Sequence, residues 1–345
     1  MRRADHGPQA ATWHAEPWPA ADALFHRDPR WRGGDAVWSI DLGGDRTLWL
    51  FGDSFIAAPD ATSRRGAAMV RNSLAITTGH DLPTAAIAFA WREVDGKPAS
   101  FFAEDGDAWF WPGHGTRVGD RLLLLQWRIV RSDQGLGFAG DGWRALVVTN
   151  PDDPPAQWRS ELCRTSDRFD AVPGAAVASD ATHVYAFTTG RLQPGPTRLL
   201  RWSRAAIASG DLRDPEWCID GAWRAEHLLR ELPGELVAVG QTEFGVVAGE
   251  RRPWLLVQTV GFGGADLAWR TADAPTGPWS PPTTLWAPPD RDRDGLYVYA
   301  AKVHPMLHTD GADLVASYST NHRDFATLVG DETLYYPRFL KLTRR

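Results

Sequence analysis

The chain has 345 residues, a formal net charge of -6 and a sequence pI near 5.9. This balance excludes a surface built for nucleic acid, which needs concentrated Lys and Arg. No apolar run is long enough for a membrane helix or an N-terminal secretory signal, so we expect a cytoplasmic protein with no membrane partner. A longer parent chain would leave a secreted or periplasmic location open. The two cysteines, Cys163 and Cys218, are isolated and predict free thiols rather than a disulfide framework.

Five short apolar strands, each preceded by a turn signal, follow one another along the chain. They are Thr47–Phe51, Leu122–Leu125, His183–Phe187, Trp254–Val257 and Leu314–Tyr318. Their anchors, which are 74, 62, 70 and 60 residues apart, are Leu48, Leu122, Val184, Trp254 and Leu314. A unit of about 67 residues repeated around a ring explains this spacing.

Each unit begins with a segment rich in glycine and alanine. These segments are Gly33–Ile40, Ala108–Gly115, Val172–Val177, Leu236–Glu243 and Tyr299–Pro305. Small residues suit the innermost strand of a propeller blade, where backbones crowd around the axis. Helical periodicity is limited to two short runs, Arg204–Ala208 and Ala225–Arg230.

The sequence therefore predicts an all-β fold. We expect residues 1–345 to form one five-bladed β-propeller of mostly antiparallel, four-stranded blades. The first 30 or so residues are either an extension or part of the ring closure.

Charged and polar residues interrupt the inner segments. Asp35, His114, Glu243, Lys302 and His304 are expected in or beside the central channel, where a charge needs a partner or a function. The chain also has 18 tryptophans, some of which must pack between sheets while others could stack on sugar rings.

Several motifs resemble a known family. Gly34–Asp35, Thr47–Ile56 and Arg71–Ile76 resemble the opening of the DUF4185 family, and its closing blade resembles Ala300–Pro305, Ser317–Asn321 and Tyr336–Phe339. Ala274–Ser280 is similar to an outer-strand turn of five-bladed glycosidases. The resemblance implies a five-bladed propeller among glycoside hydrolases that include endo-D-arabinanases, with carboxylates around a funnel. The sequence departs from this pattern in the second unit, where His114-Gly115 replaces the expected Asp-Gly.

Glycoside cleavage needs a proton donor and a second carboxylate. Asp35 is predicted to be the base or nucleophile; the alternative is an aspartate that caps a turn. Glu243 is predicted to be the general acid, because the neighbouring Phe244 would raise its pKa. The alternative for Glu243 is a salt-bridged strand glutamate.

Further residues are candidates for binding substrate, each with a structural alternative in packing, capping or inter-blade hydrogen bonding. They are Asp53, Arg71, Asn72, Trp111, His114, Trp127, Lys302, His304 and Asn321. No HxH or HExxH spacing supports a metal site, and we expect no cofactor.

These features predict a glycoside hydrolase that acts on a polysaccharide or oligosaccharide, with furanose-containing glycans such as arabinan as candidates. An inactive carbohydrate-binding propeller is the alternative, and a protein-interaction scaffold is a third possibility. The sugar, the linkage and the oligomeric state stay open.

Overall fold

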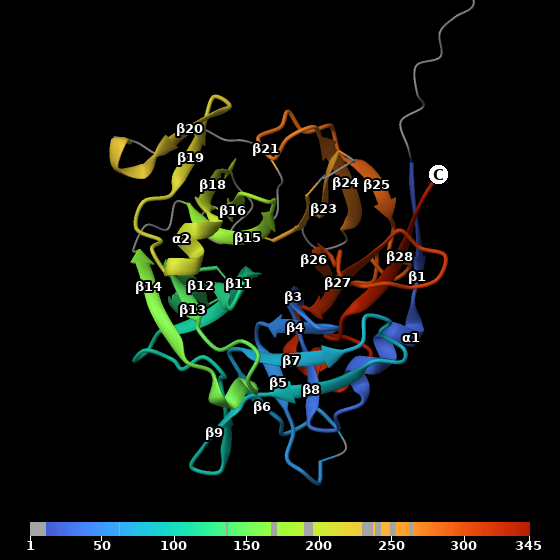
Figure 1. Ribbon diagram of the computed structural model, residues 1–345. Coiled ribbons are helices and arrows are strands. Elements are labelled where there is room, and N and C mark those ends of the chain that lie inside the picture. The colour runs from blue at the N-terminus through green and yellow to red at the C-terminus, as the bar shows by residue number, and fades with distance from the viewer. Residues whose placement is uncertain are drawn as a thin grey trace, which may run out of the picture.

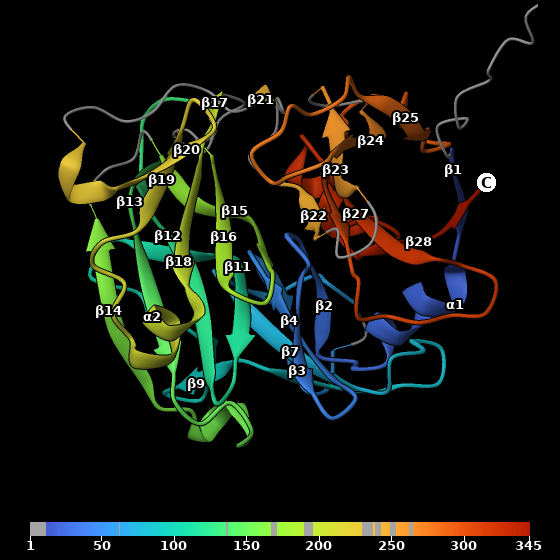
Figure 2. The ribbon, with the colours of Figure 1, turned by 45° about the horizontal axis from the view of Figure 1, so that its top comes forward.

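The chain folds as a β-propeller in which antiparallel sheets stand around a central axis (Figure 1). The computed structural model describes residues 12–61, 63–135, 137–166, 171–189, 196–229, 237–238, 243–248, 253–261 and 265–345. From the first sheet to the fifth, neighbouring sheets contact each other through their first strands, and these strands lie nearest the centre of the ring (Figures 1 and 2).

Five large sheets form the ring in the described part of the chain. The first has β3 (Trp38–Gly43), β4 (Arg46–Phe51), β7 (Ser73–Thr78) and β8 (Ala86–Ala90). The second has β11 (Trp109–Val118), β12 (Arg121–Arg131), β13 (Phe138–Val148) and β14 (Ser160–Ser166). The third has β15 (Val172–Ser179), β16 (His183–Thr189), β18 (Leu199–Ser203), β19 (Glu216–Ile219) and β20 (Ala222–Ala225).

The fourth sheet has β22 (Gly245–Val247), β23 (Trp254–Val260), β24 (Asp266–Ala272) and β25 (Thr283–Trp286). The fifth has β26 (Leu296–Val303), β27 (Leu314–His322), β28 (Arg338–Arg344) and β1 (Trp13–Pro17). One small sheet is formed by β2 (Trp31–Gly34), β5 (Ser54–Ile56) and β6 (Ala68–Val70). A second pairs β9 (Arg92–Val94) with β10 (Lys97–Ala99), and a third pairs β17 (Pro196–Thr197) with β21 (Val237–Ala238). The helices are α1 (Pro19–Asp22), α2 (Arg204–Ser209) and α3 (Phe325–Gly330), with 3-10 turns at Ala23–His26, Pro155–Gln157 and Glu226–Leu228.

The five predicted buried strands are confirmed as the second strands of the five sheets, β4, β12, β16, β23 and β27. Their anchors Leu48, Leu122 and Val184 are fully buried, and Trp254 and Leu314 are 6% and 9% exposed. These side chains pack between neighbouring sheets, so the apolar layers that hold the ring together come from the segments with the clearest sequence signal.

Crowding of the inner strands is confirmed at two glycines. A Cβ at Gly115 in β11 would lie 2.1 Å from the carbonyl oxygen of Leu123, and one at Gly245 in β22 would lie 2.3 Å from the backbone nitrogen of Val303. No real side chain tolerates such distances to backbone, so glycine is required where these strands approach their neighbours.

The predicted starts of two inner strands were wrong. In the first unit β3 begins only at Trp38, and in the fourth β22 begins at Gly245. Asp35 and Glu243 therefore lie in the loops that lead into these strands rather than on the strands. The residues between Ala238 and Glu243 lie outside the described part of the chain.

One of the two predicted helices is confirmed. α2 covers Arg204–Ser209, begins where the Ser203 side chain accepts a hydrogen bond from the Ala206 N–H, and ends at Gly210 with a φ of 73°. The second prediction was wrong, because β20 runs to Ala225 and only a 3-10 turn follows; Arg230 lies outside the described residues. No helix in the described ranges is long and apolar enough to cross a membrane.

The N-terminal strand completes the last sheet. β1 pairs with β28 in an antiparallel register that runs from Trp13 opposite Arg344 to Pro17 opposite Leu340. The two ends of the described chain thus share one sheet, and this pairing closes the ring.

Arg64 makes a second connection between the start and the end of the ring, which we call the Arg64 clasp. Its side chain is 1% exposed and donates hydrogen bonds to the backbone carbonyls of Arg32, Leu328, Asp331 and Leu334. One buried guanidinium therefore satisfies acceptors from segments nearly 300 residues apart in sequence, at the cost of a lowered pKa from burial.

Replacing Arg64 by Met should destabilise the protein by about 3 kcal/mol or more, because several buried carbonyls lose their donor at once. Denaturant unfolding of Arg64→Met checks this. Arg65→Met is the matched control, since Arg65 is exposed and should change the unfolding free energy by less than about 0.5 kcal/mol. Equal stabilities of the two variants would contradict the clasp.

Candidate functional site

Three carboxylates from distant parts of the chain lie close together, and we call them the acid cluster: Asp35, Asp53 and Glu243. Asp35 lies between β2 and β3, Asp53 between β4 and β5, and Glu243 just before β22. Besides burial, the negative charges of Asp53 and Glu243 both raise the pKa of Asp35, so both lie close enough to act on it. Asp53 and Glu243 keep 17% and 14% of their side-chain surface exposed, so the cluster is not sealed from solvent.

Asp35 is held by two tyrosines. The hydroxyl of Tyr299 donates to its Oδ2 at 2.7 Å, and the Tyr335 hydroxyl also bonds to the carboxyl group. Burial, followed by the charges of Asp53 and Glu243, raises the Asp35 pKa to about 7, and the tyrosine bonds only partly oppose this. Near neutral pH this carboxyl group is therefore poised to exchange a proton.

Backbone strain is concentrated around Asp35. Ala36, Val37, Ala300 and Tyr335 all have positive φ, from 54° to 68°. The other non-glycine residues with positive φ in the described ranges are turn aspartates, which tolerate it. A β-branched or bulky residue in this region costs about 1–3 kcal/mol and persists only where surrounding structure imposes it. Such clustering is typical of functional sites.

Glu243 forms an ion pair with Lys302 in β26. The Lys302 Nζ donates to Glu243 Oε2 at 2.5 Å and lies 3.8 Å from the centroid of the Trp38 ring. Lys302 is only 2% exposed, and burial lowers its pKa while Glu243 opposes that shift. The predicted apolar setting for Glu243 is wrong, because Phe244 packs into the core against Phe187. The salt-bridged alternative is what the structure shows.

Asp53 is fixed by a cation and an indole. Arg71 Nη1 donates to its Oδ2 at 3.1 Å, and Trp111 Nε1 donates to its Oδ1 at 2.8 Å. The Arg71 guanidinium in turn lies over the Trp109 ring, 4.4 Å from its centroid. Burial raises the Asp53 pKa, although Arg71 and Trp111 work against that rise. Two predicted substrate-binding residues, Arg71 and Trp111, therefore lie beside the acid cluster.

Asn321 is also brought to the cluster, since its Nδ2 lies 3.3 Å from the hydroxyl of Tyr299 and donates to it. The residue is partly exposed. It belongs to the hydrogen-bond chain that ends at Asp35.

Three predicted substrate-binding residues are placed in the core instead. Asn72 is fully buried and its Nδ2 donates to the carbonyls of Phe102 and Phe110. Trp127 is 3% exposed, and its Nε1 donates to the Pro173 carbonyl. These side chains have little or no surface for a sugar, so the structural alternatives describe them.

His304 is the third. It is fully buried, and its Nδ1 and Nε2 are hydrogen-bonded to the hydroxyls of Ser39 and Ser317 at 2.6 and 2.8 Å. Burial lowers its pKa to about 3, so it stays neutral. The structure therefore gives His304 a packing role in place of the predicted sugar contact.

His114 joins three sheets. Its Nδ1 accepts from the backbone N–H of Val177 at 2.9 Å, so its Nε2 carries the proton and donates to the Ser39 carbonyl at 3.0 Å. Its ring stacks on Trp38, and burial lowers its pKa to about 4. Both nitrogens are engaged, and this residue serves to hold inner strands together.

The sequence analysis missed three residues of the site: Tyr299, Tyr335 and Trp38. Each directly borders or belongs to a segment singled out from the sequence, but none of the three was given a role there. That position was the available signal. Within the described ranges, no group of three or more His, Cys, Asp or Glu could hold a metal ion.

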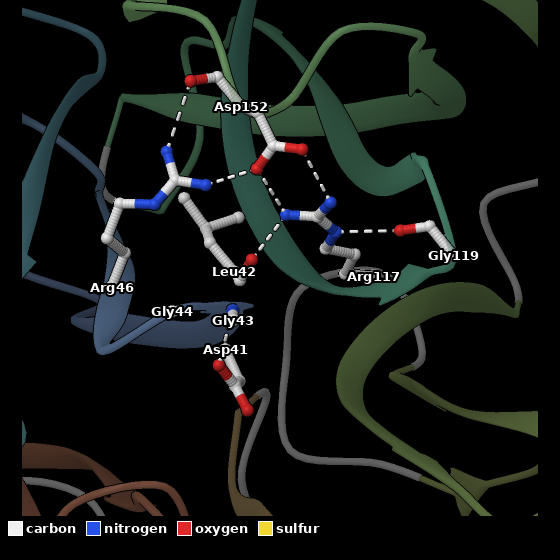
Figure 3. Close-up of a pocket in the computed structure, with 8 residues that line it drawn as sticks. All are labelled: Asp41, Leu42, Gly43, Gly44, Arg46, Arg117, Gly119 and Asp152. Atoms are coloured by element: carbon white, nitrogen blue, oxygen red, sulfur yellow. Dashed lines mark hydrogen bonds and ion pairs between the residues drawn. The ribbon is translucent and has the colours of Figure 1, made fainter.

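A separate pocket lies at the far end of β3, and the charged side chains that line it pair with one another. It is lined by Asp41, Leu42, Gly43, Gly44, Arg46, Arg117, Gly119 and Asp152. Figure 3 shows the guanidinium groups of Arg46 and Arg117 turned toward the Asp152 carboxylate. Hydrogen bonds from Arg117 hold the Asp152 pKa at about 2. This cluster ties turns of the first and second sheets together.

Asp35 makes a testable contribution to stability. Folded Asp35 keeps its proton up to about pH 7, whereas the unfolded residue loses it near its ordinary value of 3.8. The folded state therefore binds more protons between these values, and stability falls as pH rises through that window. Asp35→Asn cannot ionise and should unfold at a higher temperature than the natural chain at pH 8, by about 2–4 °C, but close to it at pH 4.

Thermal unfolding at both pH values measures this difference. Asp133→Asn removes an exposed charge and serves as the control, with no pH-dependent gain expected. A pH-independent effect of Asp35→Asn, or a loss of stability at pH 8, would contradict the raised Asp35 pKa.

Comparison with known proteins supports the fold and assigns the family. No curated protein matches the chain. Among solved structures, it is similar to a "putative hydrolase" from Bacteroides ovatus ATCC 8483, with 18% identity, a TM-score of 0.74, and 99% of this chain and 97% of that chain covered.

Glycoside hydrolases are also among the matches. One is the α-L-arabinofuranosidase PaAbf62A from Podospora anserina in complex with cellotriose (11% identity, TM-score 0.49, 97% and 98% covered). Another is the GH43_1 enzyme from Xanthomonas citri complexed with xylose (12% identity, TM-score 0.46, 95% and 93% covered).

The family comparison gives a different result from the motif resemblance. The matching model is DUF5005, a domain of unknown function, and it covers residues 20–344. The resemblance to DUF4185 is not shown by this match. Since the match takes in nearly the whole propeller, the chain belongs to the DUF5005 family.

Proposed function

We propose that this protein is a glycoside hydrolase with a five-bladed propeller fold that cleaves a polysaccharide or oligosaccharide at the acid cluster. One observation carries the proposal: two partly accessible carboxyl groups, Asp35 and Glu243, lie in one cluster but in opposite electrostatic environments. Glycoside cleavage needs one protonated and one ionised carboxyl group, and enzymes separate the two by environment.

The environments favour a division of roles opposite to the one predicted from sequence. Asp35 has a pKa near 7 and retains its proton through mildly acidic pH, so it can donate to the leaving glycosidic oxygen. Glu243 is held in an ion pair with the Lys302 ammonium. Glu243 would then activate water or attack the sugar, and only its Oε2 is engaged by Lys302.

Neighbouring groups support these roles without reacting. The Asp53 charge helps to raise the Asp35 pKa, and Arg71 and Trp111 hold that charge in place. Tyr299 orients the Asp35 carboxyl group by its hydrogen bond. These are positioning residues.

The resemblance of the motifs to DUF4185 suggests the first substrates to test. We propose furanose-containing glycans such as arabinan, because members of that family include endo-D-arabinanases. The alternative function, an inactive glycan-binding propeller, predicts binding of the same glycans without release of product.

A polysaccharide screen followed by an activated substrate tests the roles. Glu243→Gln should lose roughly 10²–10⁴-fold activity on the polymer and on an aryl glycoside with a good leaving group. Asp35→Asn should lose a similar factor on the polymer but stay within about tenfold of the natural chain on the aryl glycoside, since that leaving group needs no proton.

Glu161→Gln, at an exposed position, is the control for charge and handling. The reverse pattern would exchange the two roles and leave the hydrolase assignment standing. Binding without product release from any glycan in the panel would favour the inactive propeller.

A further inference from the structure

A pocket in the second sheet differs from the acid cluster in its chemistry. It is lined by Asp105, Phe110, Arg128, Asp141, Trp143, Arg144, Leu162 and Thr165. Its walls combine aromatic rings, two arginines and polar groups. The pocket is not part of the cluster described above.

Arg144 in β13 is fixed in position by neutral partners. Its Nε donates to the Gln126 Oε1 at 2.7 Å, and its guanidinium carbon lies 3.3 Å from the centroid of the Phe110 ring. Gln126 is only 1% exposed, so this support is rigid. A guanidinium that is stacked and bonded through Nε presents its two terminal nitrogens in one plane, the arrangement that binds a carboxylate in bidentate fashion.

No described residue accepts a hydrogen bond from those terminal nitrogens, and no described carboxylate lies within 4 Å of them. The opposing charge that acts on Arg144 is Asp105, which is exposed. Burial lowers the Arg144 pKa to about 10, so the group is still a cation at neutral pH but carries a desolvation penalty without a partner. Arg128, in contrast, is paired with Asp141.

The remaining walls suit a sugar ring. Leu162 is 59% exposed although it is a large apolar residue, and it offers a surface for the C–H face of a pyranose or furanose. The Asp141 Oδ1 is buried and lacks a hydrogen-bond partner among the described residues. A carboxylate oxygen without a donor is suited to accept a hydroxyl group.

The pocket is connected to the acid cluster through β11. Phe110 lines the pocket, and the next residue, Trp111, donates to Asp53 in the cluster. On the facing segment, Asn72 bonds to the Phe110 carbonyl while its neighbour Arg71 pairs with Asp53. Phe110 and Trp111 are successive residues of a strand, so their side chains lie on opposite faces and the pocket is a separate site near the cluster.

We propose that this pocket binds a carboxylate-bearing sugar unit, a uronic acid, through Arg144. The inference rests on the proposed function, because it makes the substrate an acidic or partly acidic glycan. Arg144 binds the carboxylate in bidentate fashion, and Asp141 accepts a hydroxyl of the same unit. Asp105 competes weakly for Arg144.

Calorimetric titration of the full chain carrying Asp35→Asn, which separates binding from cleavage, tests the proposal. The probes are tetragalacturonate, its methyl ester and sodium acetate. We expect tetragalacturonate to bind at least about tenfold more tightly than the ester, and acetate to bind far more weakly than either. Arg144→Met should abolish the preference for the acid, and Arg144→Lys should restore part of it.

Two further variants keep the result interpretable. Arg131→Met removes an exposed positive charge from the same sheet and should leave binding unchanged. Asp105→Asn removes the competing anion and should strengthen binding of tetragalacturonate. Melting temperatures of all variants verify that they fold.

Equal binding of acid and ester, or an acid preference that survives Arg144→Met, overturns the proposal. Acetate binding as tight as that of tetragalacturonate overturns the sugar part of it. Because these readouts need no turnover, they stand apart from the hydrolysis assays. Arg144-dependent binding without hydrolysis would sink only the proposed function, and hydrolysis of neutral glycans without such binding would sink only this inference.

Discussion

The centre of this propeller depends on three carboxylates held close together in a partly buried place. Burial raises the pKa of Asp35, and the charges of Asp53 and Glu243 raise it further. A chain that folds for stability alone would separate such groups or pair each with a cation. Here Arg71 compensates Asp53 and Lys302 compensates Glu243, whereas Asp35 has only hydroxyl partners. The unequal compensation is what makes one carboxyl group differ from the others.

The surrounding structure bears the resulting strain. The loop that carries Asp35 passes through positive φ at Ala36 and Val37, and the tyrosine segments pass through it at Ala300 and Tyr335. These segments come from opposite ends of the chain, and they meet because β1 pairs with β28 and because Arg64 holds the two ends together. Ring closure is therefore a condition for the site as well as for the fold, since the partners of Asp35 arrive only when the last sheet docks on the first.

The sequence predicted the parts of the fold that follow from local patterns. Turn residues followed by short apolar runs predicted β4, β12, β16, β23 and β27. Such a run, bounded by turn signals, is typical of a strand that is buried on both faces. The starts of β3 and β22 were misplaced, because a run of small residues looks the same whether it is extended or takes positive φ. Asp35 and Glu243 were identified as charges in unusual surroundings, and the structure brings them together.

Such patterns do not predict the direction in which a polar side chain points. Asn72 and His304 were both candidates for binding substrate, yet both find all their hydrogen bonds inside the core. Tyr299 and Tyr335 were missed because nothing in their sequence context tells a packed phenol from one that bonds to Asp35. Whether a polar group faces the axis or a neighbouring sheet is set by contacts with segments outside its own local pattern.

Lys302 shows how one buried side chain links architecture to chemistry. Its stem comes from β26 in the fifth sheet, its ammonium lies over Trp38 of the first, and its hydrogen bond reaches Glu243 at the entrance to the fourth. Burial lowers the pKa of Lys302, and the Glu243 carboxylate opposes that shift. The ion pair between Lys302 and Glu243 thus ties the packing of three sheets to the acid cluster. The same cation attracts Asp35 only at longer range, which leaves Asp35 as the group free to hold and release a proton.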